Sequence, residues 1–282
     1  MTSYYDSGGG GFTYPRLTKA IRVLLLINVG VFLVNMVLGG VLGEWLGCSV
    51  AGLFEFWGLG SIRIVTSQFV HSYLSPGHIL MNMLVLYFFG SMVQAEVGFR
   101  GLVKLYVVSG IVGAVVWLGM AAVLYDSDVR AVGASGACYG IMVYAAMMAP
   151  TSRVWFFGVF PVQLRLLVGI LVFLGLYSVM LEFRDGVATG TAHGAHLGGA
   201  LWGFLAFRFF RNSLMTADHR PWFGGLGAKL SQARADRRAK GEAQHQATLD
   251  QVLDKVHREG MSSLTAAERR FLERASRDAK RR

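Results

Sequence analysis

Residues 133–140 read GASGACYG, and this stretch decides the fold that we expect for the 282-residue chain. It opens an apolar run and places the hydroxyl of Ser135 between small side chains. Small residues let the backbones of two membrane helices approach closely. A second stretch of the same character, residues 192–203, carries His193 and His196. We therefore predict that these two helices meet inside a membrane and that Ser135 and His196 form a protease dyad there.

The composition is that of a membrane protein. Hydrophobic residues make up 54% of the chain and charged residues 16%, against roughly 45–50% and about 25% in soluble domains. The apolar residues lie in long runs with almost no charge, which is typical of a polytopic membrane protein. Two cysteines, Cys48 and Cys138, give no disulfide framework. Residues 1–15 are rich in Gly, Ser and Tyr, lack the features of a cleavable signal peptide and are expected to be disordered.

Six apolar runs predict six membrane spans. The fourth has only about 17 residues, the short limit for crossing a bilayer at ~1.5 Å per residue. Residues 43–77 form a long first outer loop whose aromatic side chains suit the membrane interface. We therefore expect an all-α membrane protein, a six-helix bundle with a membrane-associated outer loop. The runs cover about 20–42, 77–97, 101–125, 133–149, 161–181 and 190–210.

Basic residues predict how these spans are oriented, because Lys and Arg accumulate on the cytoplasmic side. Of the basic residues before the C-terminal tail, nine fall at the inner ends and three in the outer loops if the N-terminus is cytoplasmic. Six spans then return the tail to the cytoplasm as well. The nine are Arg16, Lys19, Arg22, Arg100, Lys104, Arg153, Arg165, Arg208 and Arg211, and the three are Arg63, Arg130 and Arg184.

This orientation brings four polar side chains to a similar depth below the outer surface: His78, Asn82, Ser135 and His196. His196 would act as general base toward Ser135 and then as general acid toward the leaving amine. His78 and Asn82 share one helix face and could donate to an oxyanion, although His78 could instead cap the helix and Asn82 could bond a neighbouring backbone. No Asp or Glu lies in the outer halves of these spans, which favours a dyad over a triad.

Tyr139 lies one helical turn below Ser135, where it could stack on the His196 ring or serve only as a packing aromatic. We interpret His71 and His193 as structural residues at the outer rim that bond loop backbone or water. A metal site would need three or four well-placed ligands, and the chain has neither an HExxH motif nor a carboxylate near these histidines. We therefore predict no metal and no cofactor.

Together these motifs resemble the rhomboid intramembrane serine proteases over roughly residues 15–211. The serine motif GxSG is residues 133–136, AHLGGALWG begins at Ala195, HILMN begins at His78, and residues 96–114 resemble the family's junction between the second and third spans. The resemblance implies that Ser135 and His196 are catalytic and that oxyanion or stabilising roles fall to His78, Asn82, Tyr139 and Gly133.

The chain departs from the family pattern at three places outside the dyad. Ile62-Arg63 stands where relatives often have Trp-Arg, and Ser75-Pro76 lengthens the spacing between His71 and His78. His193 occupies a position where some relatives have Asn. These differences concern the conformation of the first outer loop and the substrate preference.

The resemblance implies a serine endopeptidase of a bacterial inner membrane that cleaves single-span membrane proteins near the outer end of the span. A helical segment must unwind before its carbonyl can be attacked, so helix-breaking residues are expected near the cut. The main alternative is a catalytically silent relative that binds membrane clients. A small transporter is disfavoured because it would show repeats in matching halves.

The tail, residues 212–282, is expected to be soluble and helical. It holds 15 Lys/Arg and 9 Asp/Glu and so carries most of the net charge of +10. Little net positive charge remains on residues 1–211, which argues against nucleic acid as a partner of that part of the chain. Thr265 and Glu268 have the spacing of a capping box, and an earlier helix is predicted over about 242–258. The pair resembles a helical hairpin at the C-terminus of some bacterial rhomboid-like proteins. It is either a regulatory module or a basic tail near anionic lipids.

Overall fold

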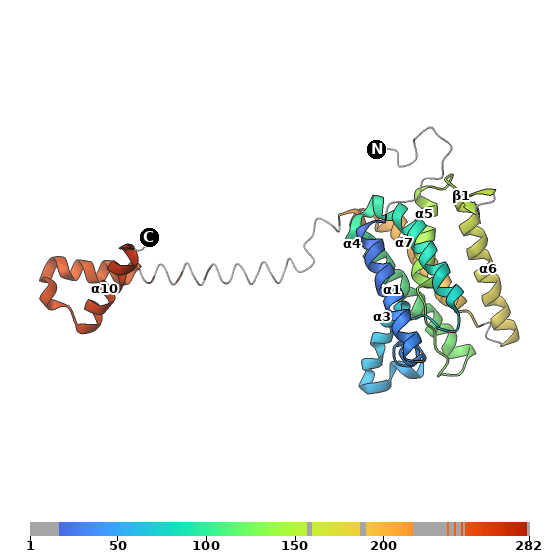
Figure 1. Cartoon of the computed structure of the whole chain (residues 1–282), viewed down its shortest axis with the longest axis horizontal. Coiled ribbons are helices and arrows are strands. Elements are labelled where there is room, and N and C mark those ends of the chain that lie inside the picture. Colours follow the sequence, from blue (N-terminus) through green and yellow to red (C-terminus); the bar gives the residue numbers. More distant parts are fainter. Residues whose placement is uncertain are drawn as a thin grey trace. The chain divides into compact units, whose positions relative to one another are not determined.

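The structure is a computed structural model that describes residues 17–156, 160–186, 190–216, 236, 240, 244 and 246–280. The disorder predicted for residues 1–15 lies outside the described residues. The chain divides into two compact units, Met1–His219 and Arg220–Arg282. The first is a bundle of helices, and the described residues of the second are mostly helical (Figure 1).

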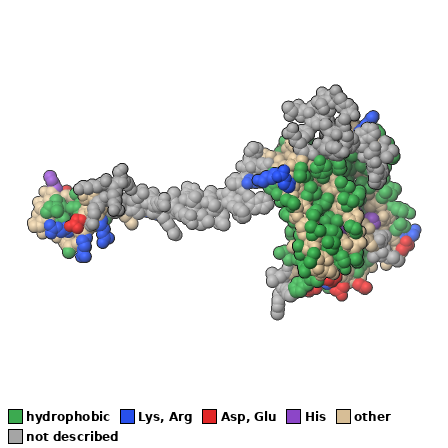
Figure 2. All heavy atoms as spheres, in the orientation of Figure 1, with side chains coloured by type: hydrophobic (Ala, Val, Ile, Leu, Met, Phe, Trp, Pro, Cys, Tyr) green, Lys and Arg blue, Asp and Glu red, His purple; other side chains and the backbone are tan. Residues whose placement is uncertain are grey.

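Helices dominate the first unit, and many large hydrophobic side chains are exposed on them. Hydrophobic side chains cover the sides of the bundle in the view of Figure 2, as lipid contact requires. Among the described helices, α1, α4 and α6 are long and apolar enough to cross a membrane, and α5 is a shorter apolar helix. The helices are α1 (Lys19–Val37), α2 (Val41–Leu46), α3 (Arg63–Thr66), α4 (Pro76–Leu124), α5 (Ser135–Met148), α6 (Leu164–Asp185), α7 (His193–Phe209) and α8 (Arg211–Met215).

A break inside α4 separates two apolar segments. Gly98 has φ 73° and ψ −175°, which is not helical, and a positive φ of this size is open mainly to glycine. The sequence ranges 77–97 and 101–125 lie on the two sides of this residue. The boundary expected between the second and third apolar runs therefore falls at Gly98.

The segment between the first two apolar runs is folded rather than a plain loop. It contains α2, α3 and three short 3-10 helices, η1 (Ala51–Leu53), η2 (Glu55–Ile62) and η3 (Ser67–Phe69). Arg63 is only 5% exposed; its Nη2 lies 2.6 Å from Glu55 Oε2 and its Nη1 donates to the Gly52 carbonyl at 3.4 Å. A buried guanidinium with two such partners fixes this segment.

The prediction of an all-α fold was wrong at one place. Strands β1 (Arg153–Phe156) and β2 (Phe160–Gln163) form an antiparallel pair, with Arg153 opposite Gln163. The fifth apolar helix consequently begins at Leu164 rather than near Pro161. Four-residue strands rich in aromatic and β-branched residues cannot be told from the start of an apolar helix by hydrophobicity alone.

Glycines allow α5 and α7 to pack at very close range. A Cβ on Gly199 would overlap the carbonyl oxygen of Gly136, and a Cβ on Gly203 would overlap that of Gly140. The close pairing predicted from the small residues of stretches 133–140 and 192–203 is confirmed. Side chains as short as serine can therefore reach across this interface.

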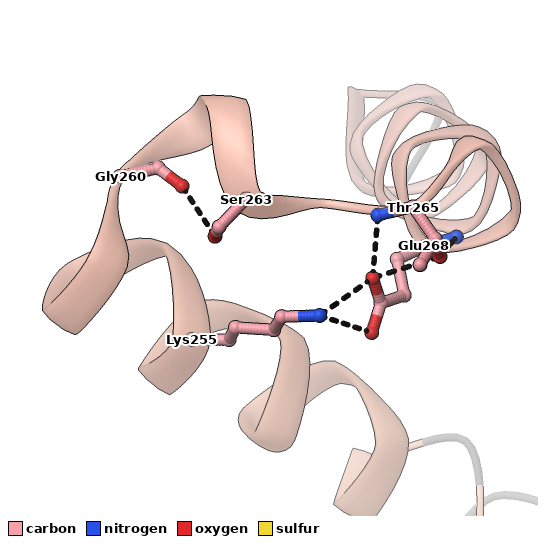
Figure 3. Close-up of polar contacts among 5 residues, drawn as sticks. All are labelled: Lys255, Gly260, Ser263, Thr265 and Glu268. Atoms are coloured by element: carbon pink, nitrogen blue, oxygen red, sulfur yellow. Dashed lines mark hydrogen bonds and ion pairs between the residues drawn. The ribbon is translucent and has the colours of Figure 1, made fainter.

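The second unit contains a helical segment at 246–259, the turn η5 (Met261–Ser263) and α10 (Ala266–Lys280). The predicted capping box is confirmed: the Glu268 N–H donates to Thr265 Oγ1 at 3.3 Å, and the Thr265 N–H donates to Glu268 Oε2 at 2.7 Å (Figure 3). Lys255 Nζ lies 3.1 Å from the same carboxylate and ties α10 to the preceding helical segment.

The hydrogen bonds from Thr265, followed by the contact with Lys255, lower the pKa of Glu268 from 4.5 to about 2. A carboxyl whose folded pKa is depressed stabilises the fold above its unfolded pKa. This contribution is therefore present above pH 4.5 and is lost as the pH falls through about 2.

Replacing Thr265 with Ala should loosen the first turn of α10 because the hydroxyl that accepts from Glu268 is removed. An N-cap contributes on the order of 1 kcal/mol, so amide hydrogen exchange in this turn should become about fivefold faster. Exchange measured by mass spectrometry on the full chain in detergent tests this. Thr265→Ser keeps the hydroxyl and should behave as the unsubstituted chain; equal acceleration in both variants would contradict the capping role.

Candidate active site

Ser135 and His196 come together at the first turns of two neighbouring helices. Ser135 is the first residue of α5, and His196 lies in the first turn of α7. The Ser135 Oγ is 2.9 Å from the His196 Nε2, a hydrogen-bonding distance, and His196 is only 8% exposed. A serine hydroxyl bonded to an imidazole nitrogen is the arrangement that activates a nucleophile.

The close approach of Ser135 to His196 depends on how the three helices α4, α5 and α7 pack together. A Cβ on Gly113 of α4 would come within 2.6 Å of the Ala195 carbonyl oxygen, and a Cβ on Gly136 of α5 within 3.0 Å of the same atom. The residue before His196 is thus held against glycines from both neighbouring helices. This packing sets the position of the imidazole relative to Ser135.

An aromatic ring covers the face of the imidazole. Tyr139 and His196 are stacked, with ring centroids 4.4 Å apart and planes at 9°. His193 meets His196 edge-on at 5.7 Å. Within the described residues the His196 Nδ1 has no hydrogen-bond partner. The ring contact with Tyr139 therefore restrains the plane of the imidazole.

His78 and Gly133 lie side by side at the turn that leads into α5. Gly133 has φ 127°, a conformation that favours glycine. A Cβ at this position would come within 2.6 Å of the His78 Cε1, so a larger residue would collide with that ring. The Gly133 N–H donates to the Ser67 carbonyl at 3.0 Å. The structure thus brings His78 next to the backbone that precedes Ser135.

Asn82 and His71 form a buried polar pair on the same side of the site. Asn82 is 5% exposed, and its Nδ2 lies 3.1 Å from the His71 Nε2. The Ala134 N–H also donates to this His71 nitrogen, at 3.3 Å. Asn82 is therefore linked through His71 to the residue directly before Ser135.

His71 bonds loop backbone, as predicted, but it is buried and not exposed at a rim. Its side chain is completely buried and contacts both Asn82 and the Ala134 backbone, and its ring centroid is 5.5 Å from that of His78. Burial, followed by the charge of His78, lowers the pKa of His71 from 6.5 to about 4. Its position follows from how α3 packs against α4 and η3 against α5, which histidine spacing in the sequence does not reveal.

The assembled groups are those needed for acyl transfer. A hydroxyl is bonded to an imidazole, and two polar side chains of α4 lie near the turn that leads into α5: His78 beside Gly133, and Asn82 linked through His71 to Ala134. Among the residues that the structure describes, no group of three or more His, Cys, Asp or Glu side chains is arranged to hold a metal ion.

Two family models match the chain. The Rhomboid domain model matches residues 58–213, which include every candidate residue named above, and a family of unknown function, DUF6576, matches residues 236–278. The chain is 31% identical over 164 residues to RHOMBOID-like protein 12, mitochondrial, of Arabidopsis thaliana, covering 52% of this chain and 46% of that protein. It is 31% identical over 170 residues to RHOMBOID-like protein 4 of the same plant, covering 59% and 38%. The match thus spans less than half of either relative.

Proposed function

The chain belongs to the rhomboid family, and from that premise we propose that it is a serine endopeptidase that cleaves membrane-spanning segments of other proteins. The observation that carries the proposal is the 2.9 Å contact between Ser135 Oγ and His196 Nε2. The site combines a nucleophile, a base and neighbouring donors, and these serve peptide hydrolysis without a cofactor.

The reaction proceeds through an acyl-enzyme. Ser135 Oγ bonds to the scissile carbonyl carbon as its proton passes to His196 Nε2, and the carbonyl electron pair moves to oxygen. Collapse of this intermediate breaks the C–N bond, and the leaving amine takes the proton from His196. Water, deprotonated by His196, then attacks the ester, and Ser135 departs with its proton restored.

The oxyanion is stabilised from the side opposite His196. The side chains of His78 and Asn82 on α4 and the Ser135 N–H at the start of α5 are the proposed donors. Gly133 supports this role because its left-handed backbone and lack of a side chain leave room for the His78 ring. Tyr139 holds the imidazole plane through the 4.4 Å stack.

The proposed setting is a bacterial inner membrane crossed six times, with both termini in the cytoplasm. Residues 16–211 form the protease domain, 1–15 a disordered N-terminus and 212–282 a cytoplasmic helical tail. Support comes from the positive charge at the inner ends of the apolar runs and from the long apolar helices α1, α4 and α6. Substrates are membrane proteins with a transmembrane helix, which reach the site through the lipid bilayer.

Cleavage of a single-span substrate in proteoliposomes tests the proposal. The purified chain should cut the substrate into two fragments, and Ser135→Ala should abolish the reaction. Ser91→Ala is the matched control, because Ser91 is also a buried serine on a helix of the bundle and its Oγ has no partner among the described residues. Equal cleavage by all three proteins would overturn the assignment. No cleavage by the unsubstituted chain on a panel of substrates would favour a client-binding role instead.

A further inference from the structure

His71 is a buried histidine that the proposed reaction does not use. It lies in the segment between η3 and α4, and its side chain has no exposed surface. Such a residue cannot touch a substrate. Its Nε2 nevertheless contacts the amide nitrogen of Asn82, a proposed oxyanion donor, at 3.1 Å and the N–H of Ala134, the residue before the nucleophile, at 3.3 Å.

These contacts determine the protonation of the ring. A backbone N–H can only donate, so the His71 Nε2 that faces Ala134 must be an acceptor. An acceptor at Nε2 requires the neutral ring with its proton on Nδ1. The Asn82 amide must therefore turn its NH₂ group toward the same nitrogen, because its oxygen would face a lone pair. Burial favours this neutral form as well.

The backbone around His71 is anchored to other elements. The His71 carbonyl accepts from Asn35 Nδ2 of α1 at 3.1 Å, and Asn35 Oδ1 accepts from the Gly43 N–H at 3.2 Å. Four residues earlier, the Ser67 carbonyl accepts from the Gly133 N–H at 3.0 Å. The segment around His71 thus connects α1 with Gly133 and Ala134, the two residues that precede Ser135.

We propose that His71 is a positioning residue, whose neutral Nε2 orients the Asn82 amide and holds the Ala134 backbone so that the oxyanion donors face the reacting carbonyl. This proposal rests on the proposed protease function. One N–H of Asn82 is engaged by His71, which fixes the plane of the amide and thereby the direction of its second N–H, the proposed donor to the oxyanion. The bond to Ala134 fixes the peptide directly before the Ser135 N–H. Two of the three proposed donors, the Asn82 amide and the Ser135 N–H, thus depend on one nitrogen.

The test compares substitutions of His71 that keep or remove a hydrogen-bond acceptor at the position of Nε2. In His71→Gln the amide oxygen can occupy the position of Nε2, whereas in His71→Asn the shorter side chain reaches only the position of Nδ1. Both are polar and uncharged. His71→Leu fills the volume without any acceptor. Cleavage of a single-span substrate in proteoliposomes gives kcat and KM for each, and thermal unfolding in detergent shows that each is folded at the assay temperature.

We expect His71→Asn and His71→Leu to lower kcat by about 10- to 100-fold with KM nearly unchanged, because a misdirected oxyanion donor acts on the transition state. His71→Gln should recover most of kcat. In an Asn82→Ala background, His71→Leu should lower kcat by a smaller factor than it does in the unsubstituted chain. His71 acts by orienting Asn82 and by holding the Ala134 backbone, and the first of these effects is already lost in that background.

Three results would overturn the proposal: full kcat in both His71→Asn and His71→Leu, a loss in His71→Gln as large as in His71→Asn, or a loss confined to KM. If His71→Leu does not fold, the Gln and Asn pair decides the matter alone. Failure of the proposed function is a separate result, since the unsubstituted chain would then show no cleavage that depends on Ser135.

Discussion

Replacing His196 with Ala is expected to lower kcat for cleavage of a single-span substrate by at least about 10³-fold, a loss of the size seen when a serine protease loses its base. The Ser135 hydroxyl has its contact with Nε2 at 2.9 Å, and without that nitrogen it has nowhere to pass its proton. Binding of the substrate does not involve this proton, so KM should change little. Initial rates in proteoliposomes measure both quantities.

His193→Ala is the matched control for this prediction. Its ring is 5.7 Å from that of His196 and stands edge-on to it, in the same turn of α7. Its removal should reduce kcat by less than about tenfold, because it takes away a neighbour of the base and not the base itself. The assignment of the base would be contradicted if His193→Ala lost the activity and His196→Ala kept it.

Replacing Gly199 with Ala should disable the site without touching either member of the dyad. The added Cβ would overlap the Gly136 carbonyl oxygen, so α5 and α7 must move apart. A displacement of ~1 Å in the reacting groups can cost about 100-fold in rate, and overpacking costs about 1–3 kcal/mol of stability. Cleavage rates and thermal unfolding in detergent should both show the loss.

Gly119→Ala in α4 is the control, because nothing lies within 4 Å of a Cβ built at that position. An alanine in an exposed helix position gains about 0.5–1 kcal/mol over glycine, so stability should hold or rise and activity should be retained. Similar losses in both variants would show that the effect comes from the helix backbone and not from contact between α5 and α7.

Local and periodic features of the structure could be predicted from the sequence. The capping box at Thr265 and Glu268 depends on residues three apart, and the close packing of Gly199 on Gly136 follows from small residues spaced by one helical turn. The approach of Ser135 to His196 followed from apolar runs and from the positions of basic residues. The first two signals lie within one or two segments of the chain, whereas the third needs the pattern of runs and charges over residues 16–211.

Other features depend on tertiary packing and could not be predicted. The hairpin of β1 and β2 is too short and too apolar to be distinguished from a helix start. His71 was assigned to the rim because the sequence does not show that α3 and η3 carry it beneath the turn at Ala134. The burial of Arg63 against Gly52 likewise requires the folded outer segment.

The most direct test of the central claim is the reaction of Ser135 with a fluorophosphonate. An activated serine displaces fluoride from phosphorus, and the phosphonyl oxygen mimics the oxyanion. Mass spectrometry of the detergent-solubilised chain should show one phosphonate per protein, located on Ser135, and His196→Ala should suppress its formation. Absence of an adduct on Ser135, or labelling at the same rate with and without His196, would contradict the assignment of Ser135 and His196 as a catalytic dyad.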